Sequence, residues 1–140
     1  MKQLTQIEKA FLLKKTSLFA SLDADLLLTI ADKFESENYK KGTKIFEIDQ
    51  ESGRIYLLIE GSVLISNRQG SPLAELRSLE IFGDEGVLSE KRRSYDAFCQ
   101  TDVLLLTLSH SHLLAILGEC PSIAIQLLEA YASNIDFRKH

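Results

Sequence analysis

The chain contains few residues of the types that mark disulfide-rich, metal-binding or low-complexity proteins. Its 140 residues include no tryptophan, one methionine, two prolines and two cysteines. Cys99 and Cys120 form no CxxC motif and show no metal-ligand spacing. We therefore expect free thiols in a reducing compartment, and neither a disulfide framework nor a zinc site.

Long apolar runs are also missing. None approaches the roughly 18 residues that a bilayer-spanning helix needs. Residues 1–6 lack the apolar segment of a signal peptide. We expect a single cytoplasmic domain that does not insert into a membrane.

Positive charge and histidine are scarce as well. The 16 basic residues are outnumbered by 20 acidic ones, and the formal net charge is −4. A nucleic-acid-binding surface would be basic, so we expect no nucleic-acid partner. His110, His112 and His140 have no carboxylate or thiol at ligand spacing, which argues against a metal. No nucleophile and base are paired, so we expect no catalytic residues, no enzymatic activity and no cofactor.

The residues that are present follow a helical period at both ends and a strand period between them. Residues 1–38 form the expected N-terminal helical segment, with Ser21 or Asp23 as the cap of its second helix. Residues 39–109 carry short strands separated by turn residues. Residues 110–140 form the expected C-terminal helices, with Ser109 as a cap and Pro121 in the first turn of the last helix. The strands are predicted at Lys44–Ile48, Arg54–Ile59, Ser62–Ser66, Leu73–Leu76, Ala97–Gln100 and Val103–Leu108.

The segment from Phe82 to Leu88, followed by Arg93, combines groups that can hold a cyclised sugar phosphate. Backbone N–H groups at a glycine turn and the start of a short helix form an anion-binding concavity. An arginine adds a forked donor for phosphate oxygens. A carboxylate beside the turn can accept a hydrogen bond from a ribose hydroxyl.

Four segments in order resemble the cyclic nucleotide-binding domain family between about Leu18 and Leu128. They are SLFASLDADLLLTIADKFESENYKKGTKIFE, RIYLLIEGSVLIS, IFGDEGVL with the following RRS, and TDVLLLTLSHSHLLAIL. The resemblance implies a mainly β fold, an eight-stranded β-roll or jelly roll with N-terminal and C-terminal helices. It also implies a phosphate-binding cassette at residues 82–96.

The resemblance further implies roles for individual residues toward cAMP or cGMP. Asp84 takes the ribose role, and Tyr131 on the last helix is a candidate to cap the base, as is Phe137. Aromatic residues on a final helix more often contact the core or a dimer partner. The phosphate-binding residues would be Gly83, Gly86, Arg93, Ser94 and Tyr95.

Several positions depart from the pattern of the family. Asp84 is one methylene shorter than the usual glutamate, and Glu85 replaces an apolar residue. Asp96 stands where a hydroxyl residue is expected. A carboxylate about 4 Å from a phosphate costs on the order of 1–4 kcal/mol, unless Asp96 points outward or pairs with Arg92. Asp49 and Leu79 occupy usual glycine positions, so we expect those two turns to differ locally.

Two functions remain open from the sequence. The first is a regulatory module that binds cAMP or cGMP and signals, through its last helix, to a separate effector protein or by self-association. The second is a degenerate roll that binds no nucleotide and serves as an interaction or dimerisation scaffold. No helix-turn-helix, kinase or channel segment appears in the sequence.

Overall fold

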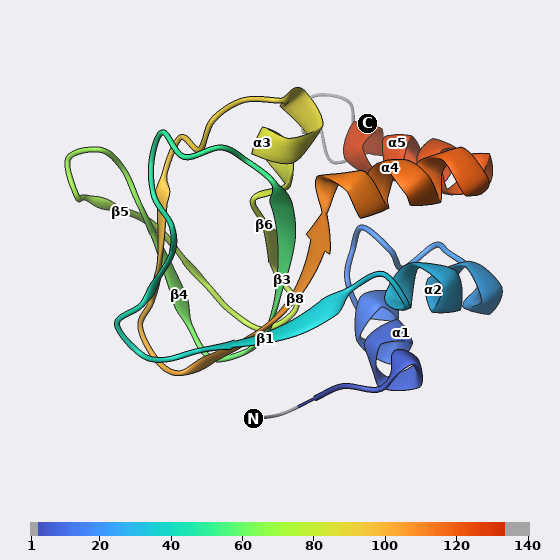
Figure 1. Cartoon of the computed structure of the whole chain (residues 1–140), viewed down its shortest axis with the longest axis horizontal. Coiled ribbons are helices and arrows are strands. Elements are labelled where there is room, and N and C mark those ends of the chain that lie inside the picture. Colours follow the sequence, from blue (N-terminus) through green and yellow to red (C-terminus); the bar gives the residue numbers. More distant parts are fainter. Residues whose placement is uncertain (1–2, 134–140) are drawn as a thin grey trace.

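Two four-stranded antiparallel sheets form a roll, with helices gathered at one end (Figure 1). The computed structural model describes residues 3–133. The strand order is β1-β8-β3-β6 in one sheet and β2-β7-β4-β5 in the other. The strands are β1 (Glu35–Tyr39), β2 (Lys44–Phe46), β3 (Arg54–Glu60), β4 (Val63–Ser66), β5 (Pro72–Leu76), β6 (Ile81–Phe82), β7 (Asp96–Cys99) and β8 (Val103–Ser109). The expected eight-stranded roll is confirmed.

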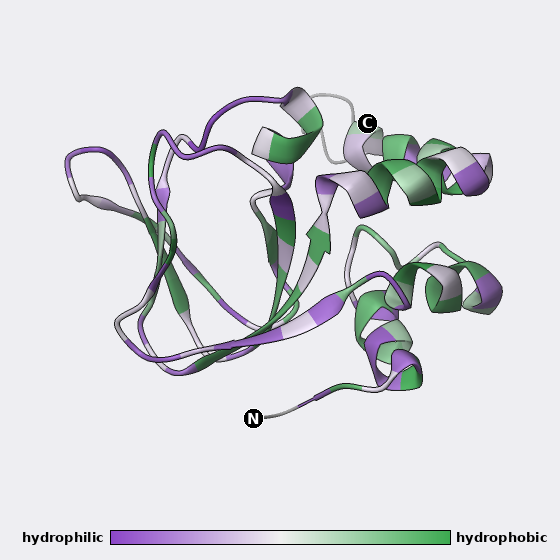
Figure 2. Ribbon diagram, viewed as in Figure 1, coloured by the Kyte–Doolittle hydropathy of each residue, from purple (hydrophilic) through white to green (hydrophobic). Residues whose placement is uncertain are grey.

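The strands β3 and β8 are buried on both faces because each separates two layers of the core. Successive side chains of a strand point to opposite faces. Leu57 of β3 packs among the helices, whereas its neighbour Leu58 packs inside the roll. Leu106 and Leu105 of β8 divide in the same way. Figure 2 shows the hydrophobic residues along these strands and on the adjoining helices.

The N-terminal helices α1 (Gln6–Lys14) and α2 (Ala24–Ala31) begin at well-formed caps. Asp23 accepts a hydrogen bond from the Leu26 amide, which confirms one of the two predicted caps. Ile7 and Phe11 lie four residues apart on α1, and 62% and 67% of these two residues, respectively, are exposed. This part of α1 is therefore an apolar surface.

The C-terminal helices are α4 (His110–Glu119) and α5 (Pro121–Ser133). The Ser109 side chain caps α4, as predicted. The helix α4 continues through Gly118 and ends at Glu119. Within residues 3–133 no single helix is long and apolar enough to cross a membrane; α4 and α5 meet that test only together and are bent by 113° at their junction.

Three local expectations were wrong. Residues 35–38, which were assigned to the helical segment, belong to β1. β6 was not expected as a separate strand. Asp49 and Leu79 have φ angles of 72° and 74°, so the backbone there keeps the left-handed conformation that glycine favours. Replacement of glycine has therefore not removed the positive-φ conformation at these turns.

Candidate functional site

The cassette is a left-handed turn, a short helix and a return strand that lie close together beside β3. Gly83 has a φ of 78° and precedes α3 (Asp84–Ser89). A Cβ atom at Gly83 would lie 2.8 Å from Nη1 of Arg93 and 3.1 Å from the Tyr56 ring. Glycine is thus required by both the backbone angle and the space. Gly83 and Arg93 are brought together as the sequence predicted.

Within residues 3–133, Arg93 is buried without a carboxylate partner. Only 3% of the residue is exposed. Its Nη1 donates to the carbonyl of Gly83 at 2.6 Å, and its Nη2 donates to the carbonyl of Arg54 at 2.7 Å. Nε is buried and has no hydrogen-bond partner. Among residues 3–133, Arg93 takes part in no ion pair.

Aromatic rings pack against this guanidinium and against one another. The centre of the guanidinium lies 4.2 Å from the Phe46 ring centroid and 5.8 Å from the Tyr56 ring centroid. Phe82 stacks on Tyr56 at 5.2 Å, and Tyr95 packs against Phe46 at 5.4 Å. The negative faces of the rings stabilise the cation in part.

The Tyr95 side chain occupies the turn at Gly83. Its hydroxyl accepts a hydrogen bond from the Gly83 amide at 3.0 Å and donates to Oε1 of Glu85 at 2.5 Å. Burial and the hydrogen bond to Glu85 raise the pKa of Tyr95, so the hydroxyl stays protonated. The resemblance implied a phosphate-binding role for Tyr95 but did not predict the hydrogen bonds of its side chain.

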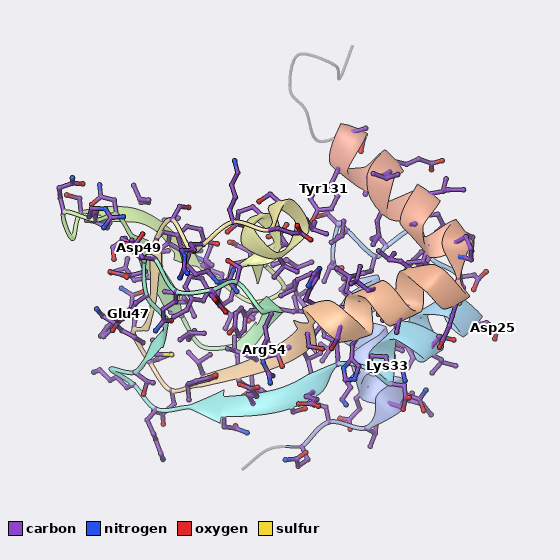
Figure 3. All side chains as sticks on the ribbon, turned by 45° about the horizontal axis from the view of Figure 1, so that its top comes forward. Asp25, Lys33, Glu47, Asp49, Arg54 and Tyr131 are labelled. Carbon is purple, nitrogen blue, oxygen red and sulfur yellow. The ribbon has the colours of Figure 1, made fainter. Side chains whose placement is uncertain are left out.

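The carboxylate of Asp84 is hydrogen-bonded to a side chain of the C-terminal helix α5. The Tyr131 hydroxyl donates to Oδ2 of Asp84 at 2.6 Å, and Tyr131 lies on the side of α5 that faces α3 (Figure 3). Burial, followed by the hydrogen bond to Asp84, raises the pKa of Tyr131. Sequence reasoning selected both residues but did not predict that they touch. Phe137, the other candidate, lies outside the described residues.

The remaining cassette residues have different surroundings. Asp96 accepts a hydrogen bond from the Ile48 amide at 2.8 Å, and among the described residues the ion pair of Arg92 is with Glu51 and not with Asp96. Gly86 is buried, and a Cβ atom there would lie 2.3 Å from Oγ of Ser52. Ser94 is exposed, and no hydrogen bond of its hydroxyl appears among the described residues. The structure therefore provides no support for a side-chain role of Ser94.

The two other bases of the cassette lie at the surface. Arg92 donates to the carbonyl of Asp49 at 2.9 Å and lies 3.9 Å from Glu51. Lys91 is exposed. Arg93 is thus the buried base of this segment, which agrees with its selection over Lys91 and Arg92.

Two cavities border the cassette on the side of α5. The first, of about 290 Å³, is lined by Asp84 and Tyr131 together with Leu79 and Ile81. The second, of about 450 Å³, is mainly apolar and lies between the roll and the helices α4 and α5. Tyr131 borders both cavities. In the described part of the chain, no group of three His, Cys, Asp or Glu residues is placed to hold a metal ion.

The sequence of this chain is similar to those of known cyclic nucleotide-binding domains. The family model of the cyclic nucleotide-binding domain matches residues 36–120. The chain is 26% identical over 130 residues to cGMP-dependent protein kinase 2 of Homo sapiens, a match that covers 89% of this chain. It is 20% identical over 128 residues to the CRP-like cAMP-activated global transcriptional regulator of Mycobacterium tuberculosis, again over 89% of this chain. The chain spans only 17% of the kinase and 57% of the regulator.

A solved structure shares the fold over most of both chains. It is the N-terminal domain of a transcriptional regulator from Streptomyces coelicolor A3(2), with a TM-score of 0.82 and 26% sequence identity. The superposition covers 89% of this chain and 92% of that chain. The roll and its flanking helices therefore recur together in that protein.

Proposed function

Because the chain belongs to the cyclic nucleotide-binding domain family, we propose that it binds cAMP or cGMP in the cassette between Phe82 and Asp96. In this proposal the chain is a regulatory module and carries no catalytic activity of its own. Arg93 and the Gly83 turn bind the phosphate, and Asp84 accepts the ribose hydroxyl.

The observation that carries the proposal is the buried, unpaired charge of Arg93. Removing a cation from water costs several kcal/mol unless an opposite charge compensates it. Two carbonyl groups and the aromatic faces supply only part of that compensation. The free Nε–H is also a donor without an acceptor. An anionic phosphate would supply both the missing charge and the missing acceptor.

Binding would require the Tyr95 hydroxyl to leave the Gly83 amide. The exchange replaces a neutral acceptor by an anionic oxygen, and charge-assisted hydrogen bonds are the stronger class. Opposing this gain, Glu85 places a carboxylate beside the turn. The affinity then depends on the balance between Arg93, which attracts the phosphate, and Glu85, which repels it.

A second candidate function is an interaction scaffold that binds no nucleotide. The observation that favours it is the occupation of the turn by Tyr95, with Glu85 as its hydrogen-bond acceptor. In that case the glycines persist as turn residues, and the helices form a docking or dimer surface.

Titration calorimetry with cAMP and with cGMP, at low and moderate salt, distinguishes the two functions. We expect roughly micromolar or tighter binding, equivalent to about −8 kcal/mol. Arg93→Lys keeps the charge but not the fork, so it should weaken binding by at least about tenfold. The exposed Arg92→Ala is the control and should bind as the wild type does.

Circular dichroism of each variant checks that the roll is folded. Affinity that persists in a folded Arg93→Lys and in Arg93→Ala would refute the cassette assignment. No heat from the wild type at high micromolar ligand would favour the scaffold.

A further inference from the structure

The outer face of the sheet β2-β7-β4-β5 carries large apolar side chains that point away from the interior of the roll. Side chains alternate along a strand, and Val63 and Ile65 of β4 are buried inside the roll. Leu64, which lies between them, therefore points outward, as does Phe98 of β7, whose two neighbours are also buried inside. The helices gather at the end of the molecule away from β4 and β5 (Figure 1).

Four residues form one row across this face, with opposite charges at its two ends. In order across the sheet they are Lys44 of β2, Phe98 of β7, Leu64 of β4 and Glu75 of β5. Neighbouring strands are about 4.8 Å apart, so the backbones of Lys44 and Glu75 are separated by roughly 14 Å. The order across the sheet is therefore base, apolar, apolar, acid.

Neither charge at the ends of the row is strongly held within its own chain. Nζ of Lys44 lies 3.7 Å from Oε1 of Glu47, and 49% and 55% of these side chains are exposed. Glu75 is exposed and accepts a hydrogen bond from the Ser62 hydroxyl at 3.2 Å. Exposed ion pairs contribute about 0–1 kcal/mol. Both end residues can therefore turn to a second partner at little cost.

Two further residues complete the face. Leu73 lies two residues from Glu75 on the same side of β5, and it is 59% exposed. Asp96 is opposite Ser66 in the pairing of β7 with β4, and it accepts a hydrogen bond from the Ile48 amide. The face thus has an apolar middle, a base at the edge formed by β2 and an acid at the edge formed by β5.

We propose that this face joins two copies of the chain around a two-fold axis that runs parallel to the strands, between the two sheets. Such an axis inverts the order across the sheet, so that Lys44 of each copy lies over Glu75 of the other. The apolar residues of the two rows meet in the middle, and Asp96 lies over the uncharged Ser66. Sheets that pack face to face lie about 10 Å apart with nearly aligned strands, which is the arrangement that this axis produces.

The order of the charges favours a second copy over an unrelated partner, because the face is complementary to itself. A two-fold axis along the row would instead place Lys44 over Lys44 and Glu75 over Glu75, which like-charge repulsion disfavours. The inference does not depend on nucleotide binding, and it places self-association on the sheet and not on the terminal helices.

Sedimentation velocity of the full chain tests the proposal. Between about 10 µM and 1 mM protein we expect a dimer with a Kd on the order of 100 µM, which weakens as salt is added. Lys44→Glu and Glu75→Lys should each weaken the dimer at least about tenfold, because each replaces two attractive pairs by two repulsive ones.

Mixing the two charge variants provides the decisive measurement. In a heterodimer of Lys44→Glu with Glu75→Lys, both opposite-charge pairs are restored between the copies, so the mixture should dimerise about as tightly as the wild type. Net charge cannot produce this result: it changes by two units in each variant, from −4 to −6 in Lys44→Glu and from −4 to −2 in Glu75→Lys. The double variant should dimerise as well.

A matched pair of leucines tests the apolar part of the face. Leu73→Ser should weaken the dimer, whereas Leu114→Ser should leave it unchanged, because Leu114 is similarly exposed (56%) but lies on α4. Circular dichroism checks that each variant is folded.

The outcomes separate cleanly. Loss of the dimer in each charge variant together with its recovery in the mixture supports the inference. A wild type that stays monomeric at about 1 mM overturns it and leaves the face to a different partner. A dimer that both charge variants leave intact, or that their mixture does not restore, overturns it as well.

Discussion

The guanidinium of Arg93 donates a 2.6 Å hydrogen bond to the carbonyl of Gly83. This bond links the segment that follows α3 to the turn that precedes it. The second amino group holds the carbonyl of Arg54 at 2.7 Å and ties the cassette to β3. Arg93 is therefore a structural residue of the roll as well as the proposed phosphate ligand.

Removal of this side chain should destabilise the protein. Arg93→Ala leaves two carbonyls without their donors, and an unsatisfied buried group costs about 1–3 kcal/mol. We expect the free energy of unfolding, measured with urea, to fall by about 2–4 kcal/mol in total. The neighbouring Arg92→Ala should change it by no more than about 0.5 kcal/mol. Equal effects of the two substitutions would contradict a structural role for Arg93.

A second prediction separates backbone strain from steric overlap at the turn. Gly83 and Gly70 both have positive φ angles, of 78° and 80°. A Cβ atom at Gly70 meets nothing within 4 Å, whereas one at Gly83 meets Arg93 at 2.8 Å. Gly70→Ala should cost about 1 kcal/mol of unfolding free energy, and Gly83→Ala about 1–3 kcal/mol more through overpacking. Thermal or urea unfolding of both variants measures the difference, and equal losses would exclude the contact with Arg93 as a cause.

A third prediction concerns the end of α3. Glu90 has a φ of 57° at the C-cap position and is exposed. Glycine tolerates this conformation better, so Glu90→Gly should raise the free energy of unfolding by about 0.5–1 kcal/mol. Glu90→Ala removes the same charge without conformational relief and serves as the control. A gain of the same size in both variants would assign the effect to charge.

A fourth prediction concerns the charge beside the turn at Gly83. Glu85→Gln keeps an acceptor for Tyr95 but removes the negative charge, so cyclic nucleotide affinity should rise about three- to tenfold. The gain should shrink as salt is added, because partly exposed charges are screened. Calorimetry at two salt concentrations measures it. Glu90→Gln, at the far end of α3, is the control, and an equal gain there would mean that net charge alone matters.

A fifth prediction concerns the thiols. Burial, with a smaller effect of Asp102, raises the pKa of Cys99 to about 11. Iodoacetamide at pH 8 should therefore modify Cys120 well before Cys99, as peptide mass spectrometry would record. Because the folded pKa exceeds the ordinary value of 9.0, this contribution to stability is complete below about pH 9 and is lost as the pH rises toward 11. Faster modification of Cys99 than of Cys120 would contradict this burial.

The strands differ in how well the sequence predicts them. β3 was expected at Arg54–Ile59 and is found at Arg54–Glu60. This prediction succeeded because an apolar run bounded by turn residues is a strong local signal for a strand. β1 escaped notice because four of its five residues, Glu35 to Asn38, are polar. It is an edge strand that pairs only with β8, and an edge strand needs no continuous apolar pattern.

The residues of the candidate site also differ in how well the sequence predicts their positions. The glycine turn and Arg93 follow from residue types that bind anions in any fold, so the sequence indicated them directly. The positions of the Tyr95 and Tyr131 hydroxyls could not be derived in this way. Each depends on a contact between residues that the chain separates, such as α5 with Asp84.

The sequence by itself determined that helices flank a run of short strands, and it determined the caps at Asp23 and Ser109 and the cassette of Gly83 and Arg93, because these features depend on local pattern and backbone preference. Tertiary structure alone decided that Arg93 is buried without a counter-charge, that Tyr95 fills the turn and that Tyr131 holds Asp84. These relationships arise when the roll closes and α5 packs beside it, since only then do side chains that are distant in the sequence come within hydrogen-bonding distance.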